Sequence, residues 1–221
     1  MHGPTAMILA LDTATDYPTI ALGIAGAPGV QLRVDDRRSL SRDIGAIVAG
    51  LLVARGVTAS ALTGVLVADG PGAFTGLRIG AAFAKGMCRA LGAPLFVAPS
   101  LLGAAVAAAR AAGGAAPVDV DVRYDALRGE CYRAVYRVAE GGVEVLSAPA
   151  LAVVGEAAWG GAGRTVLASE RDASAVALLG MMGWPGGPLV VADAGRWEPV
   201  YGRPAEAEAR RLARERDAAG R

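Results

Sequence analysis

Blocks of apolar residues alternate with polar turns along the first half of the chain, and each block predicts one element of secondary structure. Apolar runs over Met7–Asp12, Thr19–Ala25 and Val30–Asp36 are typical of β-strands separated by turn residues. The next block, Leu40–Arg55, repeats its large apolar residues with a helical period and stops at Gly56, so it predicts a helix. Its apolar face consists of Ile44, Ile47, Val48, Leu51 and Leu52.

A second strand and helix surround a glycine-rich loop. The strand Gly64–Ala68 leads into the sequence DGPGAFTG, and an apolar helix then runs to Gly92. A further strand is predicted over Pro94–Val97, followed by an alanine-rich helix that Ser100 is expected to cap at its N-terminus. The first half therefore reads β-β-β-α-β-α-β-α.

The strand pattern starts again after Pro117. Strict alternation over Val118–Asp125 and over Cys131–Val138, with LRG between them, predicts a hairpin, and Val143–Ser147 adds a third strand. Weaker helix and strand signals continue to Val191. Because each half begins with three strands, the pattern predicts a duplicated α/β chain of two lobes with a boundary near residues 100–117.

Four segments follow from this pattern. Residues 1–6 are expected to be a disordered N-terminus, residues 7–100 the N-terminal lobe and residues 101–204 the C-terminal lobe. Residues 205–221 are densely charged, so they are expected to form a solvated C-terminal helix or tail.

Composition narrows the class of protein. The 221 residues are 53% hydrophobic, with a mean hydropathy of +0.40, which is enough to bury a substantial core. The formal net charge of +1 predicts no strong, unspecific affinity for nucleic acid. Two cysteines outside any CxxC pattern suit a reducing compartment. Neither a signal peptide nor a membrane span is recognisable, so a soluble, cytoplasmic protein is expected.

The glycine-rich loop lacks the known phosphate-binding fingerprints. A Walker A loop needs lysine after its last glycine, but Leu77 follows Gly76, and the dinucleotide fingerprint needs a third glycine where Thr75 stands. The loop nevertheless combines glycines, a hydroxyl and a helix N-terminus, which are the elements of an anion site. Two interpretations stay open: an anion-binding loop, or a tight turn between strand and helix.

The helix after this loop is apolar on almost all sides. Its charged residues fall on one edge, and small residues recur at every fourth position. A line of small residues lets a second helix approach closely, which indicates a pairing helix; an ordinary core helix with a basic edge is the alternative. The charged residues are Arg78, Lys85 and Arg89, and the small residues are Gly76, Gly80 and Ala84.

The chain offers little for nucleophilic or metal chemistry. Its single histidine, His2, excludes Ser–His and Cys–His pairs as well as HxxxH metal sites. Cys88 and Cys131 fall in apolar helix and strand patterns, as packing residues do. Asp12 and Asp125 end the first strand of each half, where a carboxylate needs a partner. They indicate a cleft between the lobes, with simple turn caps as the alternative.

Four stretches together resemble the TsaB (YeaZ) family, whose members are subunits of the bacterial machinery for tRNA threonylcarbamoyladenosine. They are ILALDTAT near the N-terminus, GPGAFTGLRIG in the loop, DALRGECY in the predicted hairpin and EPVYGRPAEAE near the C-terminus. The resemblance covers about Met7 to Glu208. It implies an α/β, actin/Hsp70-like (ASKHA) duplicated fold of two lobes, each with a mixed sheet and helices, in agreement with the repeated pattern.

The resemblance also implies a role without catalysis by this chain alone. The protein would be the scaffold and activator of a complex that transfers threonylcarbamoyl to the adenosine next to the tRNA anticodon. It would pair with a metal-bearing TsaD-type catalytic paralogue, a TsaE-type small ATPase would join them, and tRNA would bind through the complex. No catalytic residue, metal or cofactor of its own is expected. ATP at the level of the complex, nucleotide binding by this subunit and a homodimer in isolation are left open.

Two sets of site residues follow from the resemblance and the patterns above, because the family pairs through helices of its first lobe. The implied partner interface comprises Ile44, Ile47, Val48, Leu51, Gly76, Arg78, Ile79, Gly80, Phe83, Ala84 and Met87. The candidate nucleotide or anion cleft comprises Asp12, Thr13, Thr15, Asp69, Gly70, Gly72, Thr75, Asp125 and Arg128.

The chain departs from the family pattern on these same surfaces. Leu40 and Arg42 stand where the family commonly has His and Glu, Asp69 stands where it often has Arg, and Leu127 stands where Arg is common. These changes bear on the partner contacts and the cleft, and not on the fold.

Two other functions are alternatives to the scaffold. One is a stand-alone small-molecule kinase of actin-like fold, with Asp12 or Asp125 as base or metal ligand. It would need adenosine-binding glycine loops in the second lobe, for which Gly160–Gly163 and Gly183–Gly187 are poor candidates. The other is a homodimeric binding protein.

Overall fold

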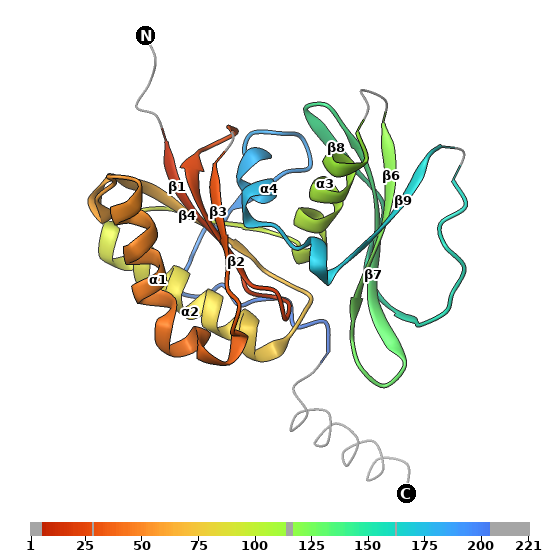
Figure 1. Ribbon diagram of the computed structural model, residues 1–221, viewed down its shortest axis with the longest axis horizontal. Helices are drawn as coiled ribbons and strands as arrows, with labels where there is room; N and C mark the ends of the chain where they lie inside the picture. The colour runs from red at the N-terminus through yellow and green to blue at the C-terminus, as the bar shows by residue number, and fades with distance from the viewer. Residues whose placement is uncertain (1–5, 28, 114–116, 162, 204–221) are drawn as a thin grey trace, which may run out of the picture.

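Two β-sheets lie on either side of a layer of helices, and a second pair of helices covers the outside of the first sheet (Figure 1). The computed structural model describes residues 6–27, 29–113, 117–161 and 163–203. Apart from Ala6, the segments predicted as a disordered N-terminus and a charged tail lie outside these residues. None of the helices in the described ranges is long and apolar enough to cross a bilayer.

The first sheet has six strands and is built around β1 (Met7–Asp12). β1 pairs antiparallel with β2 and parallel with β4. Its side chains alternate, so that Ile8 and Ala10 face the helices between the sheets while Leu9 and Leu11 face the outer helices. In spatial order the strands are β10 (Leu189–Val190), β5 (Leu95–Ala98), β4 (Leu62–Ala68), β1, β2 (Thr19–Ile24) and β3 (Val30–Arg33).

Helices α1 (Leu40–Ala54) and α2 (Phe74–Leu91) cover the outer face of the first sheet, on the side away from the second sheet (Figure 1). α2 ends at Gly92, whose φ of +63° is the left-handed conformation that favours glycine at a helix C-terminus. The helices and the sheet bury a common core. Its helical members are Leu40, Ile44, Val48, Leu51, Leu52, Ala84 and Cys88.

Helices α3 (Ser100–Ala112) and α4 (Ala175–Gly180) fill the space between the two sheets (Figure 1). The many alanines of α3 let it pack closely on the second sheet. The predicted helix cap at Ser100 is wrong. Pro99 takes the N-cap position, and the Ser100 Oγ accepts a hydrogen bond from the Gly70 backbone N–H at 2.9 Å, because the glycine-rich loop passes beside this helix end.

The second sheet has four strands, and its inner face packs on α3. β8 is longer than predicted because its second half is an exposed edge strand without a regular apolar period. β10, from the predicted C-terminal lobe, pairs with β5 and so completes the edge of the first sheet. In spatial order the strands are β8 (Gly142–Val153), β7 (Glu130–Ala139), β6 (Val118–Asp125) and β9 (Thr165–Ser169); three short 3-10 helices are η1 (Arg37–Ser39), η2 (Ala59–Ala61) and η3 (Glu170–Asp172).

The turn of the β6–β7 hairpin holds two non-glycine residues in the left-handed region. Leu127 has φ +63° and Arg128 has φ +58°, although a side chain in this region is disfavoured by roughly 1–2 kcal/mol. The Leu127 backbone N–H donates to Asp125 Oδ1 at 2.7 Å, and the Leu127 side chain is 69% exposed. Little packing therefore offsets the cost of this backbone conformation at Leu127.

Replacing Leu127 with asparagine is expected to raise the free energy of unfolding by about 0.5–1 kcal/mol, because asparagine tolerates the left-handed conformation. Urea denaturation measures the change. Leu127→Ala is the matched control, since it removes the same exposed side chain but keeps the backbone cost. Equal stability of the two variants would show that backbone strain at this turn does not contribute.

Candidate functional site

The glycines of the loop and of α2 allow the connection after β1 to lie directly against α2. A Cβ atom on Gly72 would lie 2.3 Å from the Ala14 carbonyl oxygen, and one on Gly76 would lie 2.0 Å from the Thr13 carbonyl oxygen. A Cβ on Gly80 would lie 2.3 Å from Thr13 Oγ1. The Thr13 hydroxyl in turn donates to the Gly76 carbonyl at 2.8 Å. Close packing within the chain thus accounts for these three glycines.

Residues 197–203, named here the C-terminal strap, cover the same loop from outside. The Val200 N–H donates to the Asp69 carbonyl at 2.7 Å, and the Val200 carbonyl oxygen lies 2.0 Å from where a Cβ on Gly70 would be. Tyr132 of β7 donates through its hydroxyl to the Tyr201 carbonyl at 3.2 Å. The loop is therefore enclosed by its own chain on two sides, as a tight turn is, and anion binding there stays a prediction.

The structure separates the predicted cleft residues into a buried and an exposed group. Asp12, Thr13 and Thr15 are buried where β1 ends, and Asp69 is half-buried where the adjacent β4 ends. Asp125 and Arg128 are exposed at the β6–β7 hairpin, and Thr75 is exposed at the start of α2. The predicted cleft residues therefore lie in different places: Asp12 and Asp69 follow the adjacent parallel strands, whereas Asp125 and Arg128 lie at the surface of the second sheet.

Asp12 is a fully buried carboxylate without full hydrogen bonding. Its Oδ1 accepts from the Ala14 N–H at 3.2 Å, whereas its Oδ2 has no partner within the described structure. Burial raises the pKa of Asp12 to about 7, against the lowering effect of the backbone N–H groups of Ala14 and Ser174. This carboxyl group therefore exchanges a proton close to neutral pH.

Polar groups of the second sheet lie near these acids. Burial raises the pKa of Asp69 to about 6. The buried Tyr136 hydroxyl has no hydrogen-bond partner among the described residues, and burial, followed by the charge of Asp69, raises its pKa. Tyr124 donates to the Ser100 carbonyl at 3.0 Å, and burial, followed by the charge of Asp12, raises its pKa. The interior between the sheets thus favours neutral acids.

The described residues contain no group of three or more His, Cys, Asp or Glu side chains placed to hold a metal ion. In this region Asp12 and Asp69 can exchange protons, and the Tyr124 and Tyr136 hydroxyls can form hydrogen bonds.

Several residues predicted for the partner interface are buried inside the subunit. Ile44, Val48 and Leu51 pack in the core between α1 and the first sheet, so they are not available to a partner. Gly76 and Gly80 face Thr13, and Ala84 is also buried, so the line of small residues serves packing within the chain. Of the predicted set, Arg78 is exposed and the half-buried members are Ile47, Ile79, Phe83 and Met87.

The opposite sides of α1 and α2 are exposed and are lined by small apolar residues that the sequence did not single out. A Cβ atom on Gly45, Gly50 or Gly86 would meet no other atom within 4 Å, and the Val53 side chain is 80% exposed. The sequence does show these small residues, but the larger apolar residues of each helix drew the prediction to the side that packs in the core. We name this surface the docking face; its exposed residues are Gly45, Ala46, Ala49, Gly50 and Val53 of α1 and Arg78, Ala82, Gly86, Arg89 and Ala90 of α2.

An ion-pair network on the outer face of the second sheet was also missed. Asp121 is buried and accepts from both Arg123 and Arg133 at 2.9 Å. Although burial favours the neutral acid, the hydrogen bonds from these two arginines hold the pKa of Asp121 below its ordinary value. Asp119 is likewise paired with Arg137 at 2.8 Å. Alternating acids usually mark a solvated strand face, but here the chain after β8 covers them: the Trp159 backbone N–H donates to Asp121.

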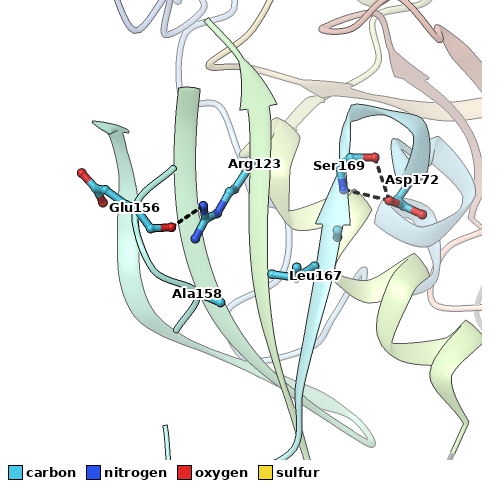
Figure 2. A pocket seen from close by; sticks show the side chains of 7 residues that line it. Arg123, Glu156, Ala158, Leu167, Ser169 and Asp172 are labelled. Carbon is cyan, nitrogen blue, oxygen red and sulfur yellow. Dashed lines mark hydrogen bonds between the residues drawn. The ribbon is translucent and has the colours of Figure 1, made fainter. Parts of the chain in front are cut away.

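An open pocket of about 470 Å³ lies between this covering segment and the edge strand β9 (Figure 2). Figure 2 shows the Arg123 guanidinium turned toward the Glu156 carbonyl, to which it donates at 2.9 Å, and Asp172 bonded to Ser169. The Arg123 guanidinium and the Asp172 carboxylate thus both form hydrogen bonds within the chain. The pocket contains none of the predicted cleft residues; it is lined by Arg123, Glu156, Ala158, Leu167, Ala168, Ser169 and Asp172.

Two mixed sheets on either side of inner helices, with three strands opening each half of the chain, define an α/β protein of the actin-like (ASKHA) class. A model of the family described as "TsaD: tRNA N6-adenosine threonylcarbamoyltransferase" matches residues 35–178. YeaZ from Pseudomonas aeruginosa superposes with a TM-score of 0.75 at 27% identity, over 89% of this chain and 99% of that one. The chain belongs to the TsaB (YeaZ) family, which confirms the resemblance found in the sequence.

Sequence relatives give the same assignment. The tRNA threonylcarbamoyladenosine biosynthesis protein TsaB of Escherichia coli is 32% identical over 136 residues, which are 62% of this chain and 57% of that protein. An uncharacterised protein of Mycobacterium tuberculosis is 35% identical over 161 residues, covering 67% of this chain and 71% of the relative. The match to the Escherichia coli protein thus spans little more than half of its length.

Proposed function

We propose that this protein is the scaffold and activating subunit of a complex that makes threonylcarbamoyladenosine in tRNA. Its partner would be the metal-bearing TsaD-type paralogue, with a TsaE-type small ATPase and tRNA joining at the level of the complex in the cytoplasm. Family membership and the printed role of the Escherichia coli relative support the pathway. The exposed docking face of α1 and α2 is the observation that carries the scaffold role.

The docking face suits a protein partner. Helices pack at axis separations of 8–10 Å that depend on the side chains between them, and the open sides of Gly45, Gly50 and Gly86 leave room for a close approach. Within the described ranges, Arg78 and Arg89 on α2 form no ion pair. A partner with apolar residues at its centre and carboxylates at its rim is therefore complementary to this face.

Two observations support a non-catalytic role. The chain has one histidine, so it cannot supply a histidine pair for a metal. Asp12, a candidate base or ligand in the kinase alternative, is 0% exposed, and the glycine-rich loop beside it is enclosed by the strap. The homodimer alternative would use a second copy of the chain on the docking face, and it is an outcome of the same test.

Ala49→Trp places a large ring on the docking face and is expected to weaken binding of the TsaD-type partner at least about tenfold, because the axes of the facing helices must separate. Calorimetry measures the affinity, and mass spectrometry of tRNA nucleosides measures modification by the reconstituted complex. Ala111→Trp, at an exposed alanine of α3 outside the docking face, is the matched control.

Unchanged affinity of Ala49→Trp would overturn the assignment of the docking face. Sedimentation of the isolated chain tests the second-copy alternative: a wild-type dimer that Ala49→Trp converts to a monomer, without any binding of the TsaD-type partner, would favour the homodimer. ATP turnover by the purified single chain would favour the kinase.

A further inference from the structure

The C-terminal strap carries the EPVYGR sequence, and it builds part of the surface at the start of α2. The Tyr201 ring lies 4.7 Å from the Phe74 ring, measured between centroids. The Arg78 guanidinium lies 4.2 Å from the centroid of Phe74 and 5.7 Å from that of Tyr201. Two rings from segments more than a hundred residues apart in the sequence thus form one platform for a single cation.

The strap contacts two cations of α2, Lys85 and Arg78, in different ways. Lys85 is neutralised, because its Nζ lies 2.9 Å from Glu198 of the strap. Arg78 is exposed and forms no ion pair with any described residue. The arginines of the second sheet, by contrast, are paired with Asp119 and Asp121. Arg78 is therefore a cation that the fold orients but does not neutralise.

Arg78 also lies on the docking face. Arg78, Ala82 and Gly86 follow one another at intervals of four along α2, and all three are exposed. A guanidinium binds a carboxylate through two parallel hydrogen bonds. Holding it on aromatic rings before binding lowers the loss of side-chain entropy when the pair forms. Arginines in such settings are over-represented among residues that dominate binding energy.

We infer that Arg78, positioned by Phe74 and by Tyr201 of the strap, is the anchor through which the docking face binds a carboxylate of the partner subunit. This inference rests on the proposed function, and it assigns to the strap the role of positioning that anchor. The tyrosine acts through the arginine, whereas the arginine itself touches the partner.

The surroundings of Arg78 favour a carboxylate over an RNA phosphate. Binding an RNA backbone requires several cations that contact successive phosphates. On α2, one of the three cations is already paired with Glu198, and the residue that follows Arg78 on the exposed line is Ala82. A single oriented guanidinium beside an apolar surface matches an acidic side chain at the edge of a protein interface.

Arg78→Gln is expected to weaken binding of the TsaD-type partner about tenfold and to reduce the dependence of the affinity on salt. Arg78→Lys is expected to recover only part of the affinity, because an ammonium cannot form the two parallel hydrogen bonds. Tyr201→Leu is expected to weaken binding several-fold, and Tyr201→Phe, which keeps the ring, to retain most of the affinity.

A double-mutant cycle separates positioning from a general effect on the fold. If Tyr201 acts through Arg78, Tyr201→Leu adds little, less than about twofold, once Arg78 is already glutamine. Additive losses would overturn the positioning role of the strap.

Comparison with Ala49→Trp distinguishes this inference from the proposed function. If Ala49→Trp abolishes binding and the Arg78 variants bind like wild type, the anchor is wrong and the docking face stands. If neither set changes the affinity, the docking face itself is wrong. If Arg78→Gln keeps the partner but lowers the affinity of the complex for tRNA, the anion that Arg78 binds is an RNA phosphate, and the carboxylate assignment is overturned.

Discussion

Gly76→Ala is expected to destabilise the protein by about 3 kcal/mol or more, at the upper end of the cost of overpacking a core. The added Cβ would lie 2.0 Å from the Thr13 carbonyl oxygen and 3.2 Å from the Thr13 carbonyl carbon. Both are backbone atoms, so no side-chain rotation relieves the overlap. Either α2 moves away from the end of β1, or the chain after β1 gives up its contacts.

Gly86→Ala is the matched control for this variant. Gly86 lies on the same helix, and a Cβ there meets no atom within 4 Å. Alanine is the better helix former, so the control is expected to gain about 0.5–1 kcal/mol. Urea denaturation of both variants measures the difference. A Gly76→Ala protein as stable as the control would show that α2 does not lie this close to residue 13 in solution.

A second contact with Thr13 determines the effect of Gly80→Leu, a substitution in the line of small residues that the sequence assigned to a pairing helix. From the sequence alone, this variant should fold and lose its partner. Because a Cβ on Gly80 would lie 2.3 Å from the Thr13 hydroxyl oxygen, the variant is now expected to be unfolded or insoluble. Substitutions on the docking face, such as Ala49→Trp, are the ones that separate pairing from folding.

Asp12→Asn is expected to stabilise the protein by on the order of 2 kcal/mol at about pH 8, and to have little effect near pH 4. Burial raises the pKa of Asp12 from 3.8 to about 7, so the folded protein retains a proton between these values that the unfolded chain releases. The free energy of unfolding therefore falls as the pH rises from about 4 to about 7. Above this range the folded protein carries a buried carboxylate with one unpartnered oxygen.

Urea denaturation over a series of pH values tests this expectation. The amide of asparagine keeps the acceptor for the Ala14 N–H but carries no charge, so its profile should be flatter than that of wild type. Asp69→Asn should reduce the pH dependence of the free energy of unfolding over a narrower range, from about pH 4 to about pH 6, because burial raises the pKa of Asp69 to about 6. Asp35→Asn, at an exposed carboxylate, is the control. An Asp12→Asn profile parallel to that of wild type would show that Asp12 is solvated in solution.

The sequence by itself determined those strands and helices whose apolar residues repeat with a regular strand or helix period. β1 and β6 have the predicted bounds, because each is an apolar or strictly alternating run between turn residues. Helix α1 follows its large apolar residues, which pack in the core as a helical face must. The restart of strands after Pro117 and the four quoted motifs were enough to indicate the family and the two-sheet fold.

Tertiary structure alone decided what each face contacts. The line of Gly76, Gly80 and Ala84 indicates that another segment packs closely on α2. Only the position of Thr13 shows that this segment belongs to the same chain and not to a partner. Asp119 and Asp121 alternate like residues of a solvated strand, and the segment containing Trp159 buries them. Side-chain period records which residues share a face, and it carries no information on which distant segment covers that face.

The aromatic platform under Arg78 is a further contact with a distant segment that side-chain period could not predict. Arg78 and Phe74 are one helical turn apart, so their contact follows from local geometry. Tyr201 comes from the far end of the described chain, and it reaches them because the strap crosses the glycine-rich loop through the Val200–Asp69 hydrogen bond. Arg78 was already among the residues predicted for the partner interface, but its aromatic platform depends on where the strap crosses the loop, which no pattern along the chain indicates.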